Sequence, residues 1–198
     1  MTDLRIGILG ASRIAPAATI QPAQTILGTV VVRVGARSLT GAQDFAAMHD
    51  IAYAHEGYDA VVNSADVDLV YVALPTSLHA GWTIKAAAAG KHVLCEKSFA
   101  MNSDEAAAML AAGEAARVRI VEAFHYRYHP AFRAFLDIVQ GGEIGSILTI
   151  EAEFSAPIAA TPGEFRHNPA LGGGAMRDLG CYTLNWCLSL DDTPITAL

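Results

Sequence analysis

Residues 4–15, LRIGILGASRIA, place a short apolar run directly before a turn of small residues. Gly10, Ser12 and Ala15 have the spacing of the G-x-G-x-x-G/A dinucleotide fingerprint, with serine in the second position. Glycine permits the tight turn, a small second residue lets the backbone approach a pyrophosphate, and alanine permits close packing of helix on strand. The stretch therefore predicts a strand, an anion-binding turn and a helix. A plain strand-to-helix turn built from small residues is the alternative.

The same rhythm of a β-branched run followed by an alanine-rich stretch continues to residue 122. The runs predicted as strands are 4–9, 30–34, 69–73, 92–95 and 119–122. The stretches predicted as helices are 13–27, 39–49, 58–63, 78–89 and 102–116. This alternation is typical of βαβ units around a parallel sheet. We expect an α/β, doubly wound domain of five or six parallel strands over residues 1–122.

The pattern changes in the last third of the chain. Residues 129–145, HPAFRAFLDIVQGGEIG, are typical of an amphipathic helix that ends at a pair of glycines. Residues 146–156, SILTIEAEFSA, alternate apolar and polar side chains, which predicts a half-buried antiparallel strand. Residues 172–186 predict another helix. We expect residues 123–198 to form a partial α+β domain with an incomplete antiparallel sheet.

Composition restricts the classes of function. The chain has 198 residues, of which 53% are hydrophobic and 17% charged, as in globular proteins. A net charge of -7 argues against nucleic-acid or anionic membrane partners, so small molecules are expected instead. The N-terminus lacks the apolar core of a signal peptide, and the longest uncharged stretch, residues 69–84, contains proline and polar residues. These features predict no membrane span and a cytoplasmic location.

The cysteines and late histidines do not form a recognisable metal motif. The chain has three cysteines, Cys95, Cys181 and Cys187. Their odd number, apolar surroundings and lack of CxxC spacing predict reduced core thiols. The histidines of the last third are His125, His129 and His167. Their spacing is irregular, so we predict no metal site.

Distinctive residues follow the second predicted strand, which ends in VGARS. Arg37 and Ser38 occupy the region where an NAD-preferring site usually presents a carboxylate to the ribose. An arginine beside a hydroxyl can bind a 2′-phosphate through charge-assisted hydrogen bonds. This favours NADP as cofactor, with NAD as the second possibility. For Arg37, a solvated loop charge is the alternative.

Two further predicted strands also end in unusual residues. Pro75, Thr76 and His79 follow the strand at 69–73, and the pair Glu96 and Lys97 follows the strand at 92–95. Taken singly, the histidine fits a helix start and the pair fits a solvated surface feature. Because carboxyl ends of parallel strands meet at the edge where open α/β sheets bind ligands, their convergence predicts a binding site.

Five segments in chain order carry a family resemblance: GILGASRIA (7–15), VYVALPTSLH (70–79), AGKHVLCEKS (89–98), EAFHYRYHP (122–130) and GGGAMRDLGCY (172–182). Together they resemble the Gfo/Idh/MocA family of NAD(P)-dependent oxidoreductases over nearly the whole chain. The EAFxYRxHP string and the tyrosine at 182 are similar to the branch with glucose-fructose oxidoreductase and dimeric dihydrodiol dehydrogenase.

The resemblance implies a Rossmann domain followed by an α+β domain whose open sheet often mediates oligomerisation, with the substrate held between them. It assigns three catalytic residues by position, Lys97, Asp178 and Tyr182. We expect hydride transfer between nicotinamide C4 and a carbinol or carbonyl carbon of a sugar-like or dihydrodiol-like molecule. Tyr182 would exchange a proton with the substrate oxygen, Lys97 would stabilise the alkoxide and Asp178 would orient these groups.

The cofactor-binding residues expected from motif, position and resemblance form one set. They are Gly10, Ser12, Arg13, Ile14, Arg37, Ser38, Leu74, Pro75, Thr76, His79, Glu96, Lys97 and Arg127. Arg166 is a further candidate, and both it and Arg127 fit an exposed basic side chain equally well. For Asp178 and Tyr182, a backbone cap and a packed core tyrosine are the alternatives.

Two departures from the family pattern matter. Ser98 stands where the EKP motif has proline, and serine makes a cis bond costly, so we expect Lys97 to be held less rigidly. The chain ends in DDTPITAL, where residues 194–198 would begin a next strand and family members continue. Either the sequence is a fragment or a partner chain supplies the missing strands. The alternative function is a catalytically inactive, nucleotide-binding remnant.

Overall fold

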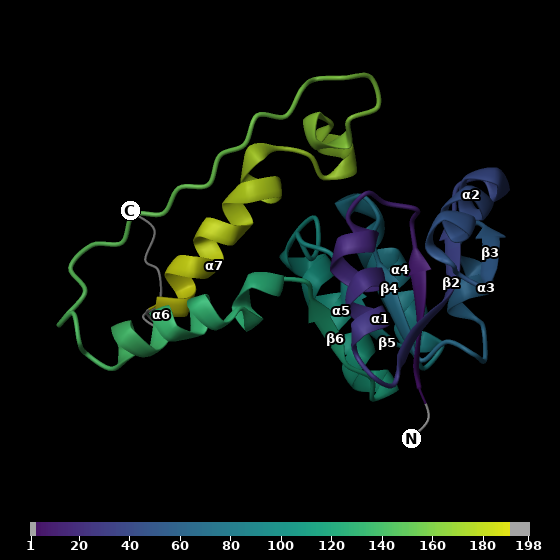
Figure 1. Ribbon diagram of the computed structural model, residues 1–198. Coiled ribbons are helices and arrows are strands. Elements are labelled where there is room, and N and C mark those ends of the chain that lie inside the picture. Colours follow the sequence, from purple (N-terminus) through teal and green to yellow (C-terminus); the bar gives the residue numbers. More distant parts are fainter. Residues whose placement is uncertain (1–2, 191–198) are drawn as a thin grey trace. The chain divides into compact units, whose positions relative to one another are not determined.

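The computed structural model describes residues 3–190 (Figure 1). The chain divides into two compact units at the bond between Ala123 and Phe124. Because each unit has its own internal packing, the two are described separately.

A six-stranded sheet forms the centre of the first unit. Its strands are β1 Leu4–Leu9, β2 Thr29–Ala36, β3 Tyr53–Glu56, β4 Leu69–Val72, β5 His92–Cys95 and β6 Ile120–Glu122. Their order is β3-β2-β1-β4-β5-β6, and every neighbouring pair is parallel. The chain reverses its direction across the sheet between β1 and β4, the doubly wound arrangement. The predicted α/β class and parallel sheet are confirmed, although β3 was not predicted.

Helices connect the strands. They are α1 Gln21–Thr25, α2 Leu39–His49, α3 Asp59–Val62, α4 His79–Ala88 and α5 Ser103–Ala116. The helix predicted from residue 13 begins later, with a π-helical turn at Pro16–Ile20 that leads into α1. Asn102 caps α5, since its side chain accepts a hydrogen bond from Glu105 N at 2.9 Å. A cap of this kind satisfies one of the free N–H groups of the first turn.

The two faces of the sheet bury alternate side chains of each strand. On β1, Ile6 and Ile8 pack with residues of α1 and α2, whereas Leu9 packs with residues of α3, α4 and α5. On β4, Tyr71 lies on the α1 and α2 face between two valines of the opposite face. Each fully buried Leu or Ile stabilises the fold by about 1.5–3 kcal/mol. This packing fixes the strands whose carboxyl ends carry the predicted site.

The second unit contains two long helices. They are α6 Pro130–Gln140 and α7 Cys181–Leu190, the latter preceded by a π-helical turn at Met176–Gly180. Short 3-10 turns lie at His125–Tyr128, Phe165–His167 and Pro169–Leu171. His129 caps α6 by accepting from Ala131 N at 3.1 Å. The predicted helix ending at the glycine pair is confirmed.

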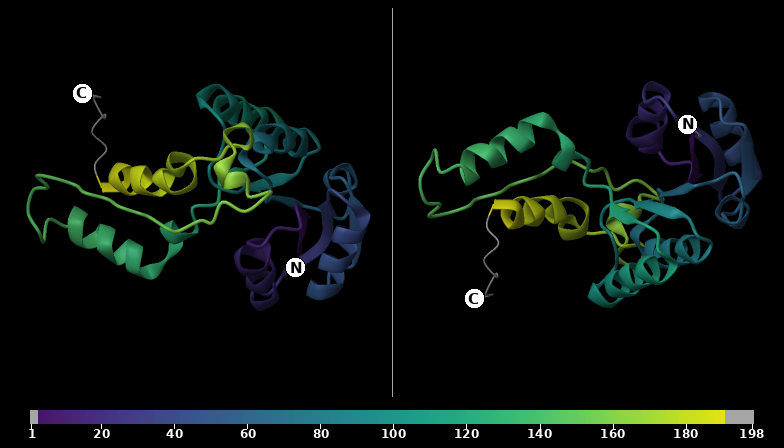
Figure 2. Two further views of the ribbon diagram at one scale, coloured as in Figure 1. Left: turned by 90° about the horizontal axis from the view of Figure 1, so that it is seen from above. Right: turned by 90° about the horizontal axis from the view of Figure 1, so that it is seen from below.

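The strand predicted over residues 146–156 is not formed. These residues lie in an extended, largely exposed segment, and the described part of the second unit contains no strand. Figure 2 shows this segment near α6 and α7, where Phe154 contacts Tyr182 and Trp186 with ring centroids 5.4 and 5.9 Å away. A strand requires a neighbour that pairs with its backbone, so alternation of side chains alone does not produce one. The predicted strand at 194–198 lies outside the described residues.

The prediction of core thiols holds for Cys95, which is buried, whereas Cys181 and Cys187 are half-buried. Within residues 3–190, no helix is long and apolar enough to cross a membrane.

An ion pair at the amino-terminal edge of the sheet gives a pH-dependent prediction. Hydrogen bonds from the Arg5 side chain, at 2.9 and 2.7 Å, lower the pKa of Asp68 to about 2. The ionised pair therefore stabilises the fold above an unfolded-state pKa of about 3.9 and loses this effect as pH falls through the folded value. Since the two side chains are 39% and 34% exposed, we expect Asp68→Asn to lower the unfolding free energy by under about 1 kcal/mol at pH 7.

Urea unfolding at a series of pH values tests this expectation. The difference between the wild type and Asp68→Asn should shrink as pH falls below about 4. A difference that stays constant from neutral to acidic pH would contradict the assignment.

Candidate functional site

Gly10 forms a turn that only glycine fits, directly after β1. Its φ is +103°, and a Cβ there would lie 2.5 Å from Ala73 O, at the end of β4. Its N–H donates to Gly35 O on β2 at 2.8 Å. The turn therefore joins the carboxyl ends of β1, β2 and β4, the three strands around the point where the strand order reverses.

The turn continues with exposed residues and one unsatisfied hydroxyl. Ser12 N donates to Gly10 O at 2.8 Å, and Arg13 and Ile14 are exposed. Ser12 Oγ is buried and has no hydrogen-bond partner among the described residues. Leaving a buried hydroxyl unpaired costs about 1–3 kcal/mol. A ligand anion in this turn would provide the missing acceptor.

The segment that follows β2 contains an arginine and a serine that caps the next helix. Arg37 and Ser38 are both exposed. Ser38 Oγ accepts from Gly41 N at 3.2 Å and caps the 11-residue helix α2. The Ser38 hydroxyl can still donate its own hydrogen to an anion. Both residues lie where the sequence predicted contact with a 2′-phosphate.

His79, for which the sequence predicted a cofactor contact, lies in the core at the start of α4, and that contact stays a prediction. It is fully buried, with Nε2 2.8 Å from Leu74 O and Nδ1 2.9 Å from Ser98 O. Burial lowers the pKa of His79, although the backbone carbonyls oppose this shift. Each ring nitrogen lies within hydrogen-bond distance of a backbone carbonyl, and because a neutral imidazole carries one N–H, His79 donates to one of the two. Nearby, Leu74 and Thr76 are also buried and Pro75 is half-buried.

The end of β5 carries Glu96 and Lys97, both half-buried. Glu96 Oε1 accepts from the Tyr71 hydroxyl at 2.5 Å, and Glu96 Oε2 accepts from Lys97 N at 3.3 Å. The Lys97–Ser98 peptide bond is cis, although serine replaces the proline of the motif. Tyr71 was missed by sequence reasoning, and its only signal was one polar tip inside the apolar run VYV.

Tyr182 lies among aromatic rings in the second unit. The ring centroids of Phe124 and Phe154 are each 5.4 Å from its own, and that of Tyr126 is 5.8 Å away. Tyr126 itself donates to Asn185 Oδ1 at 2.5 Å. Packing of this kind holds a tyrosine ring in a defined orientation.

Asp178 lies in the π-helical turn that precedes α7, whereas Tyr182 lies in the first turn of α7 itself. Asp178 Oδ2 is 3.4 Å from Arg166 Nε, and Arg166 Nη1 also donates to Glu164 Oε1 at 3.0 Å. Arg166 therefore bridges two carboxylates. Of the interpretations considered for this residue, a simple exposed basic side chain fits these contacts less well.

Arg127 lines a groove between α6 and α7 in the second unit, with a volume of about 360 Å³. All other lining residues are apolar or carry an amide or hydroxyl group: Phe132, Leu136, Gln140, Asn185, Leu188 and Ser189. The cofactor contact expected for Arg127 stays a prediction.

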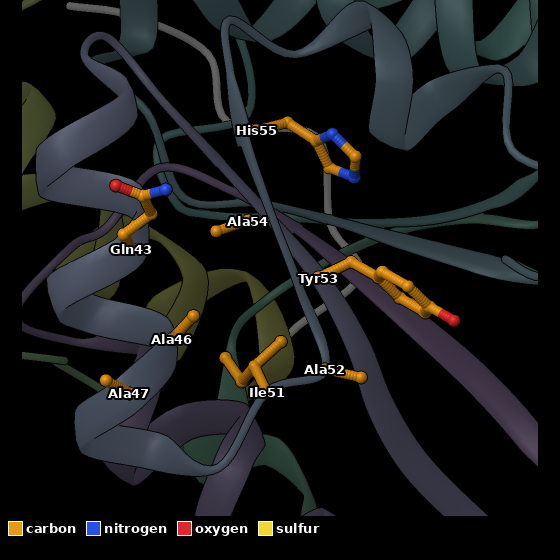
Figure 3. Close-up of a pocket in the computed structure, with 8 residues that line it drawn as sticks. All are labelled: Gln43, Ala46, Ala47, Ile51, Ala52, Tyr53, Ala54 and His55. Atoms are coloured by element: carbon orange, nitrogen blue, oxygen red, sulfur yellow. The ribbon is translucent and has the colours of Figure 1, made fainter.

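A second hollow, of about 380 Å³, lies against α2 and the amino end of the edge strand β3 (Figure 3). It is lined by Gln43, Ala46, Ala47, Ile51, Ala52, Tyr53, Ala54 and His55. None of these is a predicted site residue. Ligands of open α/β sheets bind at the carboxyl ends of strands, so this hollow is not the candidate site.

Among residues 3–190, no three His, Cys, Asp or Glu side chains are grouped as metal ligands.

Comparison with known proteins defines the family. Residues 4–124 match the oxidoreductase family with an NAD-binding Rossmann fold, and residues 132–198 match the GFO/IDH/MocA C-terminal domain. The chain belongs to the GFO/IDH/MocA family. The resemblance predicted from the motifs is thereby confirmed, and the strand ends described above are those of a GFO/IDH/MocA Rossmann domain.

Several named proteins resemble this GFO/IDH/MocA chain. D-xylose 1-dehydrogenase (NADP(+)) 2 of Haloferax volcanii is 34% identical over 182 residues, covering 92% of the chain and 55% of that protein. Trans-1,2-dihydrobenzene-1,2-diol dehydrogenase of Xenopus laevis is 35% identical over 156 residues, covering 79% and 47%. The chain thus spans about half the length of such curated relatives.

A solved structure is similar over almost the whole chain. It is that of KijD10, a 3-ketoreductase from Actinomadura kijaniata in complex with NADP and TDP-benzene. The TM-score is 0.89 at 31% identity, and the match covers 96% of this chain and 57% of that one.

Proposed function

We propose that this protein is an NADP-dependent oxidoreductase that transfers a hydride between nicotinamide and a carbinol or carbonyl carbon of a sugar-like or dihydrodiol-like small molecule. Family membership and relatives named as sugar and diol dehydrogenases support the reaction type. The observation that carries the proposal is the Gly10 turn, which joins three strand ends and contains the unpaired Ser12 hydroxyl.

The residues present at the strand ends fit a dinucleotide. The turn from Gly10 to Ile14 would hold the pyrophosphate, and Arg37 with Ser38 would hold the 2′-phosphate. In this proposal residues 1–122 are the dinucleotide-binding domain and residues 123–198 contribute to substrate binding and oligomerisation. Bound NADP supplies the hydride chemistry at C4 of its nicotinamide.

Side chains of the protein would transfer the proton and stabilise the charge that develops on the substrate oxygen. The Tyr182 hydroxyl would exchange a proton with the substrate oxygen, and the aromatic rings around Tyr182 would hold that hydroxyl in place. Lys97, a fixed cation, would stabilise negative charge that develops on the substrate oxygen. Asp178, paired with Arg166, would orient the segment that precedes α7.

The Arg37 side chain provides a test of coenzyme preference. Arg37→Ala should weaken NADPH binding by about tenfold to 100-fold, because it removes charge-assisted hydrogen bonds to the 2′-phosphate. NADH lacks this phosphate, so its affinity should change little. Fluorescence titration with both coenzymes measures the two effects. Equal losses for NADPH and NADH would contradict a role at the 2′-phosphate.

The proposed activity is tested by following nicotinamide absorbance with NADP(H) and a panel of aldoses, ketoses and cyclic diols. We expect oxidation or reduction with members of at least one of these classes. Coenzyme binding with no turnover on any compound, and none when the assay is repeated with longer chains containing this sequence, would instead support the inactive nucleotide-binding protein.

We also infer a homo-oligomer formed through the second unit, in the cytoplasm. Large apolar side chains of this unit are exposed, including Leu148 at 95%, Leu184 at 48% and Leu188 at 49%. Leu184 and Leu188 are four residues apart on α7 and therefore share one face, and exposed apolar faces often mark interaction surfaces. Light scattering at several protein concentrations measures the assembly, and a monomer at every concentration would contradict it.

A further inference from the structure

Two fully buried polar side chains reach the end of β5 from different parts of the first unit. Tyr71, on the face of the sheet covered by α1 and α2, donates its hydroxyl to Glu96 at 2.5 Å. His79, at the start of α4, places Nδ1 2.9 Å from Ser98 O. Neither side chain has any exposed surface. Glu96 and Ser98 are the two neighbours of Lys97 in the chain.

We infer that Tyr71 and His79 are positioning residues that fix Lys97 by holding the residues on either side of it. The inference rests on the function proposed for Lys97. Glu96 connects Tyr71 to Lys97, since its second carboxylate oxygen accepts a hydrogen bond from Lys97 N at 3.3 Å. The other ring nitrogen of His79 lies 2.8 Å from Leu74 O, so the ring is packed between the β4 and β5 loops, and its single N–H donates to one of the two carbonyls.

The burial of Tyr71 and His79 indicates that their polar groups hold a loop, because packing alone would not require a polar group at either position. A tyrosine hydroxyl or an imidazole in an apolar core is costly unless it forms hydrogen bonds. Phenylalanine at 71 would fill nearly the same space without that cost. The hydroxyl instead reaches a carboxylate 25 residues further along the chain, and charge-assisted bonds of this type are stronger than neutral ones.

Positioning matters for a lysine because its side chain is long and flexible. A four-carbon stem gives the ammonium group many conformations, and most of them must be excluded before the group can act on one substrate atom. Fixing the backbone at Lys97 removes part of that freedom before the substrate arrives. Phe99 N, which donates to Glu122 Oε1 at 2.9 Å, anchors the segment two residues further on.

Lysine acetylation measured without coenzyme or substrate tests the inference. The wild type, Tyr71→Phe and a control, Tyr53→Phe, would be treated briefly with acetic anhydride, and peptide mass spectrometry would give a rate for each lysine. Tyr53 is half-exposed on the edge strand, so its variant removes a tyrosine hydroxyl away from β5. Lys85 serves as the internal reference.

In Tyr71→Phe, the Lys97 rate should rise by about threefold to tenfold, the effect of losing one hydrogen bond. The Lys85 rate should not change, and Tyr53→Phe should resemble the wild type. Glu96→Gln removes the charged acceptor of the same bond and should give the same rise, which keeps the test valid if Tyr71→Phe does not fold. Unchanged Lys97 rates in the folded variants would overturn the inference.

Turnover of the same variants separates this inference from the proposed function. A raised Lys97 acetylation rate supports the positioning role whatever the turnover. If turnover then stays at the wild-type level, the catalytic role of Lys97 is contradicted instead. An unchanged acetylation rate overturns the positioning role even if turnover falls.

Discussion

Replacing Tyr182 with phenylalanine should reduce turnover by about 100-fold to 10,000-fold, the usual contribution of a positioned proton-transfer group. Phenylalanine keeps the ring among Phe124, Tyr126 and Phe154 but removes the hydroxyl. Coenzyme binding should therefore stay close to that of the wild type. Steady-state turnover and NADPH titration measure the two effects on the same preparation.

Tyr128→Phe is a matched control for that variant. Tyr128 is 63% exposed in the same unit, so loss of its hydroxyl should leave turnover unchanged. If Tyr182→Phe also turned over at the wild-type rate, the proton-transfer role of Tyr182 would be wrong. If NADPH affinity collapsed together with turnover, the tyrosine would have to be assigned to coenzyme binding.

Replacing Gly10 with alanine should have the second large effect, on both stability and coenzyme binding. At φ +103° an L-residue is strained, and the added Cβ would meet Ala73 O at 2.5 Å. We expect a loss of about 2–4 kcal/mol in unfolding free energy from backbone strain and steric overlap. NADPH affinity should fall by about tenfold or more as β1 and β4 separate. Urea unfolding and fluorescence titration measure these changes.

Gly90→Ala separates the two causes. Gly90 also has a positive φ, +75°, but a Cβ there would meet nothing within 4 Å. Its variant should therefore show the backbone strain of about 1–2 kcal/mol without loss of NADPH affinity. Equal effects of Gly10→Ala and Gly90→Ala on coenzyme binding would contradict the account of the Gly10 turn.

Much of the first unit could be predicted because its signals are local. Strand runs such as 4–9 and 92–95 have β-branched and apolar residues bounded by turns, and α5 has a capping asparagine. β3 was missed because its four residues, YAHE, contain no β-branched side chain. At the edge of the sheet, two of these residues are half-buried and two are exposed. Its pairing with β2 depends on tertiary structure, which outweighs local propensity.

The sequence indicated which residues follow the strand ends but not which side chains they contact. Position at the strand ends indicated Glu96, Lys97 and His79, yet the sequence could not show that the His79 ring is turned into the core. Nor could it indicate Tyr71, whose partner is 25 residues away. In the second unit, the alternating segment at 146–156 has the side chains of a strand, but none of the described residues there pairs with it.

The central claim, that the carboxyl ends of the parallel strands bind NADP, is tested most directly by titrating the protein with NADPH and following nicotinamide fluorescence. The account predicts saturable binding of one NADPH per chain, tighter than that of NADH and weakened in Gly10→Ala. No saturable binding of either coenzyme to the folded protein would contradict it.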